Sequence, residues 1–435
     1  MVADNDRLPG NEQPTAEVGK PEKPHPEHQQ VPVVPDAPPV PFRAMLARTM
    51  ATRAERRLGV KFVTDEDAVS DAPTLLLRRP DSFYRRMGAD GLIGFGEAFQ
   101  AGDWETADLA RTLTVLVAGM DRIMPRPLQR IRGHRAAPRP PKEEVQTVGG
   151  ARRNARHHYG LPDELFRVFM DETMCYSSAI FLTDSAGLLV ANDDSLADAQ
   201  RRKIDRLLDL AAVGENTRLL EIGTGWGELS VRAAQRGATV HTVTNMAEHA
   251  AMAHARVAEA GLNDRIRIDL ADYRDIAADA GSFDAIVSVE MIEAVGRGYW
   301  PTFFQKLESL LAPGGRIGLQ NMVMPHDRMR RTSNTYTWIN KYIFPGGLLP
   351  SVEAIEQTLA RHTGLTITDR FAFGAHYAAT LALWRERFNR NWDSVADLGF
   401  DEVFRRTWNF YLAISEAGFS TGYLNVYQFL LESSQ

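Results

Sequence analysis

A glycine-rich turn after a short apolar strand is the feature of this sequence whose residue types and spacing most clearly suggest chemistry. The run Glu221-Ile222-Gly223-Thr224-Gly225-Trp226-Gly227 follows Arg218-Leu219-Leu220 and precedes a helical pattern that begins near Glu228. Glycines permit positive φ and let backbone amides approach a ligand, while the acidic residue at the strand end can pair with a ligand ammonium group. The spacing differs from the dinucleotide pattern G-x-G-x-x-G. We predict a nucleotide site with contacts from Glu221, Gly223, Thr224, Gly225 and Gly227.

Polar residues at the ends of the next two predicted strands could complete this site. Asp272 and Tyr273 follow the third strand, at the carboxyl edge where open α/β sheets bind ligands, so Asp272 can accept a hydrogen bond from an adenine amine. The alternative for Asp272 is an exposed polar loop. Thr244 and Asn245 end the second strand, where they could either hold a ribose or cap the following helix. The sequence leaves both interpretations open.

The elements that position these residues alternate between strands and helices from Pro162 onward. Apolar runs of strand length are separated by helical patterns, and glycine-containing turns at 281–284 and 311–315 precede the last two runs. The predicted strands are Arg218–Ile222, Thr239–Thr244, Ile266–Leu270, Ala285–Val289 and Arg316–Met322. This alternation predicts an α/β fold with a doubly wound, parallel sheet.

Composition divides the chain into four segments. Residues 1–40 are rich in Pro, Glu, Lys and Gln and predict a disordered tail. Residues 41–124 carry amphipathic helical patterns and predict a small N-terminal α/β domain. Residues 125–150 predict a basic Pro- and Arg-rich linker, because repeated prolines prevent a continuous helix. Residues 151–435 are the predicted catalytic domain.

Overall composition excludes several classes of protein. The 435 residues carry a net charge of -6, which argues against a nucleic-acid binder. The single cysteine, Cys175, excludes an intrachain disulfide and fits a reducing cytosol. No apolar run approaches the roughly 18 residues of a membrane span, so we expect a cytoplasmic protein whose membrane contact is peripheral. We predict no metal site.

Distinctive residues also occur in six segments outside the glycine turn: Tyr159–Phe166, Met174–Phe181, Leu196–Lys203, Ser288–Gly296, Trp338–Gly347 and Gly374–Tyr377. The turn resembles motif I of S-adenosylmethionine-dependent methyltransferases, and the ordered series resembles the cyclopropane fatty acid synthase and mycolic acid methyltransferase family over about residues 150–435. Gly94–Trp104 resembles the extra N-terminal domain of bacterial cyclopropane synthases. The resemblance implies a class I, Rossmann-like methyltransferase fold with helical insertions around a lipid site. It also implies S-adenosylmethionine as cofactor and places Tyr176 and Ser177 among its contacts.

The reaction that the resemblance implies is methyl transfer to the double bond of an unsaturated phospholipid acyl chain. The π electrons attack the sulfonium methyl and leave a carbocation, from which a base must remove a proton. In the family this base is thought to be a bicarbonate held by Cys, Glu, His and Tyr side chains and by backbone amides. The matching positions here are Ser178, Glu293, Gln320 and Tyr377, so the Cys and the His are replaced.

These replacements leave the base and the product open. Ser178 and Gln320 can still donate hydrogen bonds to a bicarbonate. Without that anion, the base would be a protein carboxylate such as Glu293, Glu143 or Glu144. A base near the transferred methyl closes a cyclopropane, whereas a displaced base gives time for a hydride shift and an exocyclic methylene. We predict the 10-methylene product, which a reductase partner would convert to a 10-methyl acid of the tuberculostearic type; a cyclopropane-fatty-acyl-phospholipid synthase is the alternative.

A run of basic residues in and after the predicted linker suggests a further partner. These side chains predict contact with an anionic membrane surface, and the alternative is a solvated linker. The run consists of Arg126, Arg130, Arg132, His134, Arg135, Arg139, Lys142, Arg152, Arg153 and Arg156.

The sequence argues against two functions from other classes. A non-catalytic regulatory subunit is opposed by the intact glycine turn together with Asp272, Glu293 and Tyr377. A small-molecule or polyketide methyltransferase is opposed by the family segments that lie outside the cofactor fold.

Overall fold

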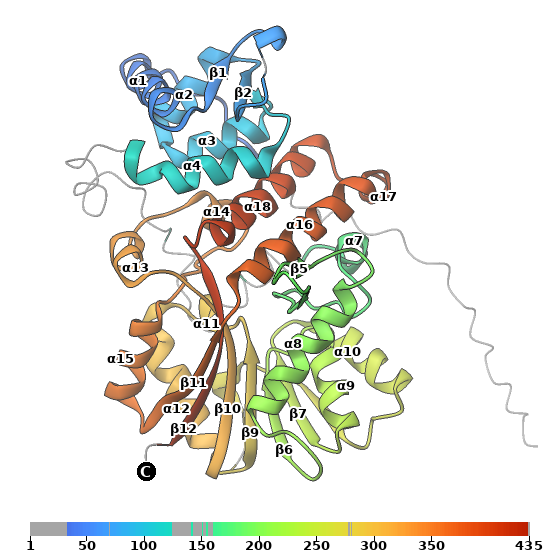
Figure 1. Ribbon diagram of the computed structural model, residues 1–435. Helices are drawn as coiled ribbons and strands as arrows, with labels where there is room; N and C mark the ends of the chain where they lie inside the picture. The colour runs from blue at the N-terminus through green and yellow to red at the C-terminus, as the bar shows by residue number, and fades with distance from the viewer. Residues whose placement is uncertain are drawn as a thin grey trace, which may run out of the picture.

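The computed structural model describes residues 33–68, 70–123, 141, 150, 154, 160–276, 279 and 281–433. In Figure 1 an N-terminal unit lies above a layer of helices, and this layer covers the upper edge of a large sheet. Residues 1–32, most of the predicted linker and the basic run from Arg126 to Arg156 lie outside the described residues, as do Glu143 and Glu144.

A mixed sheet of seven strands forms the centre of the catalytic unit, in the order β11-β12-β10-β9-β6-β7-β8. The five strands from β8 to β10 run parallel, while β12 is antiparallel to both of its neighbours, β10 and β11. The strands are β6 (Arg218–Ile222), β7 (Thr239–Thr244), β8 (Ile266–Leu270), β9 (Phe283–Val289), β10 (Leu311–Val323), β11 (Leu365–Ala372) and β12 (Asn425–Ser433). The prediction of a doubly wound α/β fold is confirmed. Two strands, β11 and β12, were not predicted, and the antiparallel β12 makes the sheet mixed instead of parallel.

Helices cover both faces of this sheet because successive strand residues point to opposite sides. On β6, Leu219 packs in a cluster with α8, α9 and α10, whereas Leu220 packs in a cluster with α12 and α15. These helices are α8 (Leu196–Leu210), α9 (Glu228–Gln235), α10 (Ala247–Glu259), α12 (Trp300–Leu310) and α15 (Val352–His362). Short helical segments lie between the strands: η4 (Tyr273–Asp275), α11 (Ile292–Val295) and η5 (Arg297–Tyr299).

The helical layer at the carboxyl edge of the sheet comes from three separate parts of the sequence. The long helices α16 and α18 pack against each other, and α7 packs against α16. The elements of this layer are α7 (Asp163–Phe169), the hairpin β4 (Leu182–Thr183) and β5 (Leu189–Val190), α13 (His326–Thr332), α14 (Trp338–Tyr342), α16 (Gly374–Arg390), α17 (Trp392–Asp397) and α18 (Glu402–Ser420). The layer occupies the place expected of helical insertions above a methyltransferase sheet.

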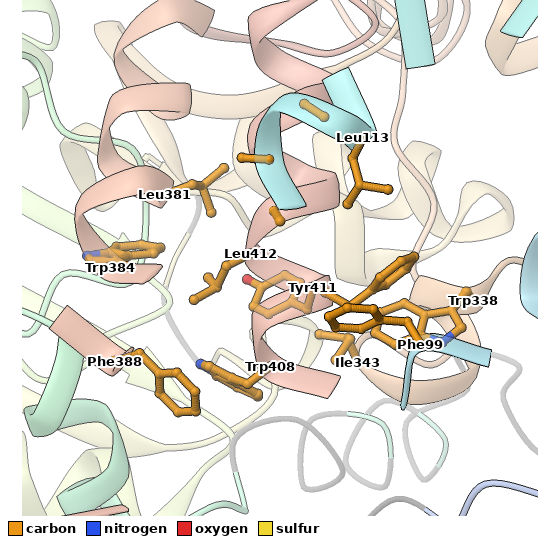
Figure 2. Close-up of a cluster of buried hydrophobic side chains, with 14 of the residues drawn as sticks. Phe99, Leu113, Trp338, Ile343, Leu381, Trp384, Phe388, Trp408, Tyr411 and Leu412 are labelled. Carbon is orange, nitrogen blue, oxygen red and sulfur yellow. The ribbon is translucent and has the colours of Figure 1, made fainter. Parts of the chain in front are cut away.

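The N-terminal unit has a three-stranded sheet in the order β1-β2-β3, packed with helices. Its elements are α1 (Pro41–Leu58), β1 (Lys61–Val63), η2 (Glu66–Ala68), β2 (Thr74–Leu77), α2 (Pro80–Asp90), α3 (Leu92–Gln100), β3 (Trp104–Glu105) and α4 (Leu109–Ile123). Helices α3 and α4 pack on α18. Figure 2 shows Phe99 and Leu113 of this unit in the same group of buried side chains as Trp338, Tyr411 and Leu412.

Candidate active site

The glycine turn has the backbone geometry that its sequence predicts. Gly223, Gly225 and Gly227 have φ values of +96°, +51° and +90°, a region that favours glycine. A Cβ added at Gly225 would have no other atom within 4 Å, so open space lies beside this residue. At Gly223 the same Cβ would lie 3.0 Å from the side chain of Met291. The turn therefore forms a backbone cradle that is open beside Gly225.

The two polar side chains of the turn are held below it. Thr224 shares a 2.8 Å hydrogen bond with Thr242. Ser230 of α9 donates to the buried carboxylate of Glu221. Burial raises the pKa of Glu221 to about 7, although bonds from Ser230 and Thr242 and the charge of Lys203 oppose the shift. Glu221 and Thr224 thus shape the turn from within.

The other predicted cofactor residues on the sheet have partners inside the chain. The hydroxyl of Thr244 accepts from the backbone N–H of Met246 at 3.2 Å; Met246 is itself the N-cap of α10, and no side chain caps this helix. Both carboxylate oxygens of Asp272 accept from the guanidinium of Arg274 at 2.7 Å. Tyr273 is buried and stands edge-on to Phe303, and burial raises its pKa to about 12. Asn245 lies at the carboxyl end of β7, between Thr244 and Met246.

Tyr176 and Ser177 lie above the sheet, where they face two different environments. The Tyr176 hydroxyl is 2.7 Å from that of Tyr411, and its ring stacks on Trp384 with centroids 5.2 Å apart. The Ser177 hydroxyl accepts a 2.6 Å hydrogen bond from the buried ammonium of Lys203. Tyr176 contributes an aromatic face, and Ser177 orients a positive charge beneath the site.

A carboxylate that the sequence interpretation did not select occupies the centre of the predicted catalytic group. Glu290 follows β9, is half-buried and has φ of +53°, a strained value for a residue with a side chain. Its Oε1 accepts from the backbone N–H of Ser178 at 3.2 Å and from the Gln320 amide at 2.9 Å. Its Oε2 accepts from the Tyr377 hydroxyl at 2.8 Å. The structure therefore brings Ser178, Gln320 and Tyr377 together around Glu290.

A chain of side-chain amides fixes the direction of the Gln320 donor. Arg206 donates to Oε1 of Gln428 at 2.7 Å, and Nε2 of Gln428 donates to Oε1 of Gln320 at 3.1 Å. Because its oxygen is occupied in this way, Gln320 presents its NH₂ group to Glu290. Gln320 and Gln428 are fully buried, so each of these donors and acceptors needs its partner.

Glu293 stands apart from this group of donors. Its Oε1 accepts from the backbone N–H of Met322, and Oε2 has no hydrogen-bond partner among the described residues. Burial and the nearby charge of Glu290 raise the pKa of Glu293 to about 8. A carboxyl group with this pKa is largely protonated at neutral pH and can act as a hydrogen-bond donor.

Electrostatics favour an ionised carboxylate at Glu290 over Glu293. The pKa of Glu290 is raised above its ordinary value by desolvation, and the Gln320 hydrogen bond, the charge of Lys203 and bonds from Ser178 and Tyr377 oppose this rise. Burial and the charge of Glu290 hold the pKa of Tyr377 well above its ordinary value, so the hydroxyl stays protonated and donates. The site thus combines a half-buried carboxylate with donors that stabilise its charged form.

Glu290 and Lys203 are the polar residues that sequence interpretation missed. Glu290 lies within the family segment Ser288–Gly296, but the resemblance drew attention to Glu293. A charged residue directly after the apolar strand β9 was the available signal, the same signal that identified Asp272 after β8. Lys203 lies on a helix, and its sequence neighbours give no sign that it is buried.

Comparison with known proteins agrees with this arrangement. Residues 147–429 match the mycolic acid cyclopropane synthetase family. The chain belongs to the mycolic acid cyclopropane synthetase family. It is accordingly a methyltransferase with the S-adenosylmethionine-dependent class I fold. The predicted family, fold and enzyme class are confirmed.

Two curated relatives extend over most of the chain. Tuberculostearic acid methyltransferase UfaA1 of Mycobacterium tuberculosis is 49% identical over 403 residues, which are 92% of this chain and 93% of that protein. The cyclopropane-fatty-acyl-phospholipid synthase of Escherichia coli K12 is 33% identical over 357 residues, or 81% of this chain and 86% of that protein.

Solved structures of smaller relatives match the catalytic unit. The cyclopropane synthase MmaA2 of Mycobacterium tuberculosis has a TM-score of 0.57 and 31% identity, and the match covers 64% of this chain and 97% of that one. Mycolic acid cyclopropane synthase CmaA1, complexed with SAH and CTAB, has a TM-score of 0.57 and 28% identity, with the same coverage. In the described part of our chain, no helix is long and apolar enough to cross a membrane.

Proposed function

We propose that this enzyme transfers a methyl group from S-adenosylmethionine to the double bond of an unsaturated phospholipid acyl chain, with Glu290 as the base that removes the proton. The observation that carries the proposal is the set of donors from Ser178, Gln320 and Tyr377 that converge on the one half-buried carboxylate of Glu290. The relatives named as a tuberculostearic acid methyltransferase and as a cyclopropane-fatty-acyl-phospholipid synthase support the substrate class.

The cofactor would bind in the cradle formed by Gly223, Gly225 and Gly227, whose open space suits its polar end. S-adenosylmethionine would supply an electrophilic sulfonium methyl group to the π electrons of the alkene. Aromatic rings lie close to Glu290. Tyr377, which donates to Glu290, stacks on Phe419 at 4.4 Å between centroids, and Tyr176 stacks on Trp384. Aromatic faces of this kind stabilise the positive charge that develops on the acyl chain.

Glu290 would then take a proton from the methylated acyl chain. Its carboxylate gains the proton, and the electrons of the broken C–H bond form the new bond of the product. Direct removal from the transferred methyl closes a cyclopropane ring. Removal after a hydride shift to the neighbouring cation leaves an exocyclic methylene, and the atoms balance in both cases.

A carboxylate from the chain itself would replace the bicarbonate expected from the family resemblance. The backbone of Ser178, the amide of Gln320 and the hydroxyl of Tyr377 would otherwise hold that anion, but all three donate to Glu290. Together with the 49% identity to UfaA1, this supports the methylene product over the cyclopropane. The 33% identity to the Escherichia coli synthase keeps the cyclopropane as the second candidate.

The proposed reaction also implies a partner protein and a location in the cell. A methylene lipid requires a reductase partner before it becomes methyl-branched. With a lipid substrate, the enzyme would act at the cytoplasmic face of the membrane, where the basic run from Arg126 to Arg156 would meet anionic headgroups. Binding to anionic vesicles that weakens sharply with added salt would support this contact, and salt-independent binding would count against it.

The test is product analysis of lipids from cells that contain oleate and express this chain alone. We expect oleoyl phospholipids to gain the mass of one CH₂ group and to show vinylidene resonances in proton NMR. Upfield cyclopropane resonances would instead establish the second candidate. No mass gain from a protein that binds S-adenosylmethionine would contradict both and favour a non-catalytic subunit.

A further inference from the structure

A basic cavity lies on the outer side of the segments that hold the active site. It has a volume of about 320 Å³ and is formed by η5, the first turn of α12, α13 and one face of α15. Its charged and titratable lining residues are Arg297, Arg330, Arg361, His326 and His362. None of the described residues that line it is acidic. A volume near 300 Å³ is at the lower end of the range for small-ligand pockets.

The three arginines of this cavity are exposed, and none of them has an acidic partner among the described residues. Many other arginines pair with carboxylates, and Arg328 of the same helix α13 pairs with Asp121 at 3.4 Å. Of the described acidic residues on α12, α13 and α15, Glu356 pairs with Arg370 and Glu308 accepts from the backbone of Gly364, while Asp327 and Glu353 are exposed and do not line the cavity. Like charges that face one cavity without counter-charges favour the binding of an anion.

Two further features of the cavity suit an anion with several oxygens. His326 is held by a 2.7 Å hydrogen bond between its Nδ1 and Ser351, which leaves Nε2 available. The cavity also meets the start of α12 at Trp300 and Pro301, where no side chain caps the helix. The positive end of the helix dipole favours phosphate there, although the backbone N–H of Trp300 already donates to the carbonyl of Arg297 and Pro301 has no N–H. Arginine forks match phosphate oxygens in pairs.

The cavity is connected to the reacting centre through short stretches of chain. Arg297 follows α11, which carries Glu293, and α13 follows β10, which carries Gln320. Met322 lies on β10, after Gln320 and before α13, and its backbone N–H donates to Glu293. A phosphate held in the cavity would therefore be anchored to the same two segments that build the site.

We propose that this cavity binds a phosphate group. We assign this phosphate to the headgroup of the phospholipid whose acyl chain is methylated. This assignment rests on the proposed function. Free phosphate has the same recognition chemistry and is the other source that the test separates.

The test uses the full-length chain with Arg297, Arg330 and Arg361 all changed to Gln. Arg331→Gln is the matched control, because Arg331 is an exposed neighbour on α13 that does not line the cavity. Calorimetric titration with inorganic phosphate and with glycerol phosphate measures binding without any need for catalysis. We expect the triple variant to lose affinity for glycerol phosphate by about tenfold or more, since charge-assisted bonds are removed, and the control to bind like wild type.

Kinetics then identify the source of the phosphate. For a headgroup site, the triple variant should raise KM for dioleoyl phosphatidylglycerol about tenfold or more with kcat retained, and should leave KM for methyl oleate in neutral micelles unchanged. Loss of inorganic phosphate binding with an unchanged phospholipid KM would assign the cavity to free phosphate. Equal phosphate binding by wild type and triple variant would overturn the proposal. A wild-type protein that binds glycerol phosphate but transfers no methyl group would contradict the proposed function and leave the phosphate site supported.

Discussion

At the scale of single residues, the two glutamates that follow β9 have opposite environments. Glu290 receives three hydrogen bonds from surrounding donors, which favour its ionised form. Glu293 accepts a backbone hydrogen bond on one oxygen and has no partner for the other among the described residues, which favours its protonated form. Two neighbouring carboxyl groups whose environments separate their pKa values can divide the roles of base and donor.

Replacing each glutamate by glutamine distinguishes these roles. Glu290→Gln should lower kcat by about 10²- to 10⁴-fold, the usual contribution of a general base. Glu293→Gln should retain most activity at neutral pH, because an amide resembles a protonated carboxyl in shape and can donate. Methyl transfer to dioleoyl phospholipid is measured for both, with calorimetric titration of S-adenosylmethionine as a control for folding. The opposite ranking of the two variants would assign the base to Glu293.

The raised pKa of Glu293 also predicts how stability depends on pH. The folded carboxyl has a pKa of about 8 and the unfolded one about 4.5, so between these values the folded state holds the extra proton. The contribution to stability is therefore fully present below pH 4.5, declines as pH rises and is lost above pH 8. Urea unfolding between pH 5 and 8 should show a shallower decline for Glu293→Gln than for wild type. The remaining slope would belong to Glu221 and Glu290, and identical slopes would contradict the protonated state of Glu293.

Sequence reasoning identified most of the site because its residues lie in ordered motifs. Ser178, Gln320 and Tyr377 come from distant segments, and the family resemblance was sufficient to group them. It could not show that a strained Glu290 fills the space between them, since this depends on a backbone turn with φ of +53°. Nor could it show that Asp272 binds Arg274, two residues away, through both oxygens.

At the scale of secondary structure elements, the contact between α3 and α14 connects the N-terminal unit with the active-site segment. Glu97 of α3 is buried and accepts from Lys341 and, at 2.8 Å, from Tyr342. Gln100 receives a 2.9 Å hydrogen bond from Trp338. The chain after α14 reaches Leu348, whose backbone N–H donates to the carbonyl of Glu293 at 2.9 Å. Helix α3 therefore supports the segment that positions Glu293.

A methyl group added between these helices should disturb both stability and activity. A Cβ at Gly96 would lie 2.5 Å from Cδ1 of Trp338, closer than side chains can approach. We expect Gly96→Ala to cost about 1–3 kcal/mol in the free energy of unfolding, the usual cost of overpacking, and to lower kcat as α14 moves. Gly214→Ala is the control, because a Cβ there meets no atom within 4 Å. Equal unfolding midpoints in urea for the two variants would show that α3 and α14 pack less closely than described.

The strands were predicted unevenly, for a reason that lies in their surroundings. Strands β6, β7 and β8 have the predicted bounds because they are apolar runs between helical patterns. The last two, β11 and β12, follow α15 and α18 and form antiparallel pairs. The residues of β11 are largely exposed, so its sequence lacks the apolar run that identifies a central strand.

At the scale of the whole molecule, the predicted N-terminal and catalytic domains share one hydrophobic core. Phe95, Phe99 and Trp104 of the N-terminal unit belong to the same buried cluster as Trp338 and Phe410 of the catalytic unit. Figure 2 shows the side chains of this cluster reaching from Phe99 and Leu113 to Trp384 and Phe388. Composition could suggest a boundary near residue 124, but the amount of apolar surface buried across it depends on three-dimensional packing.

This shared core predicts that the two units unfold together. Phe410 on α18 lies between them, with ring centroids 5.7 Å from Phe99 and 4.7 Å from Trp338. Phe410→Ala should lower the free energy of unfolding by about 3–5 kcal/mol, because it leaves a cavity at the centre of the cluster. Thermal unfolding followed by circular dichroism and by tryptophan fluorescence should show one transition, shifted equally for both probes. Two transitions, with only one midpoint temperature lowered by the variant, would mean that the N-terminal unit folds independently. The support that α3 gives to the Glu293 segment would then be lost whenever that unit unfolds.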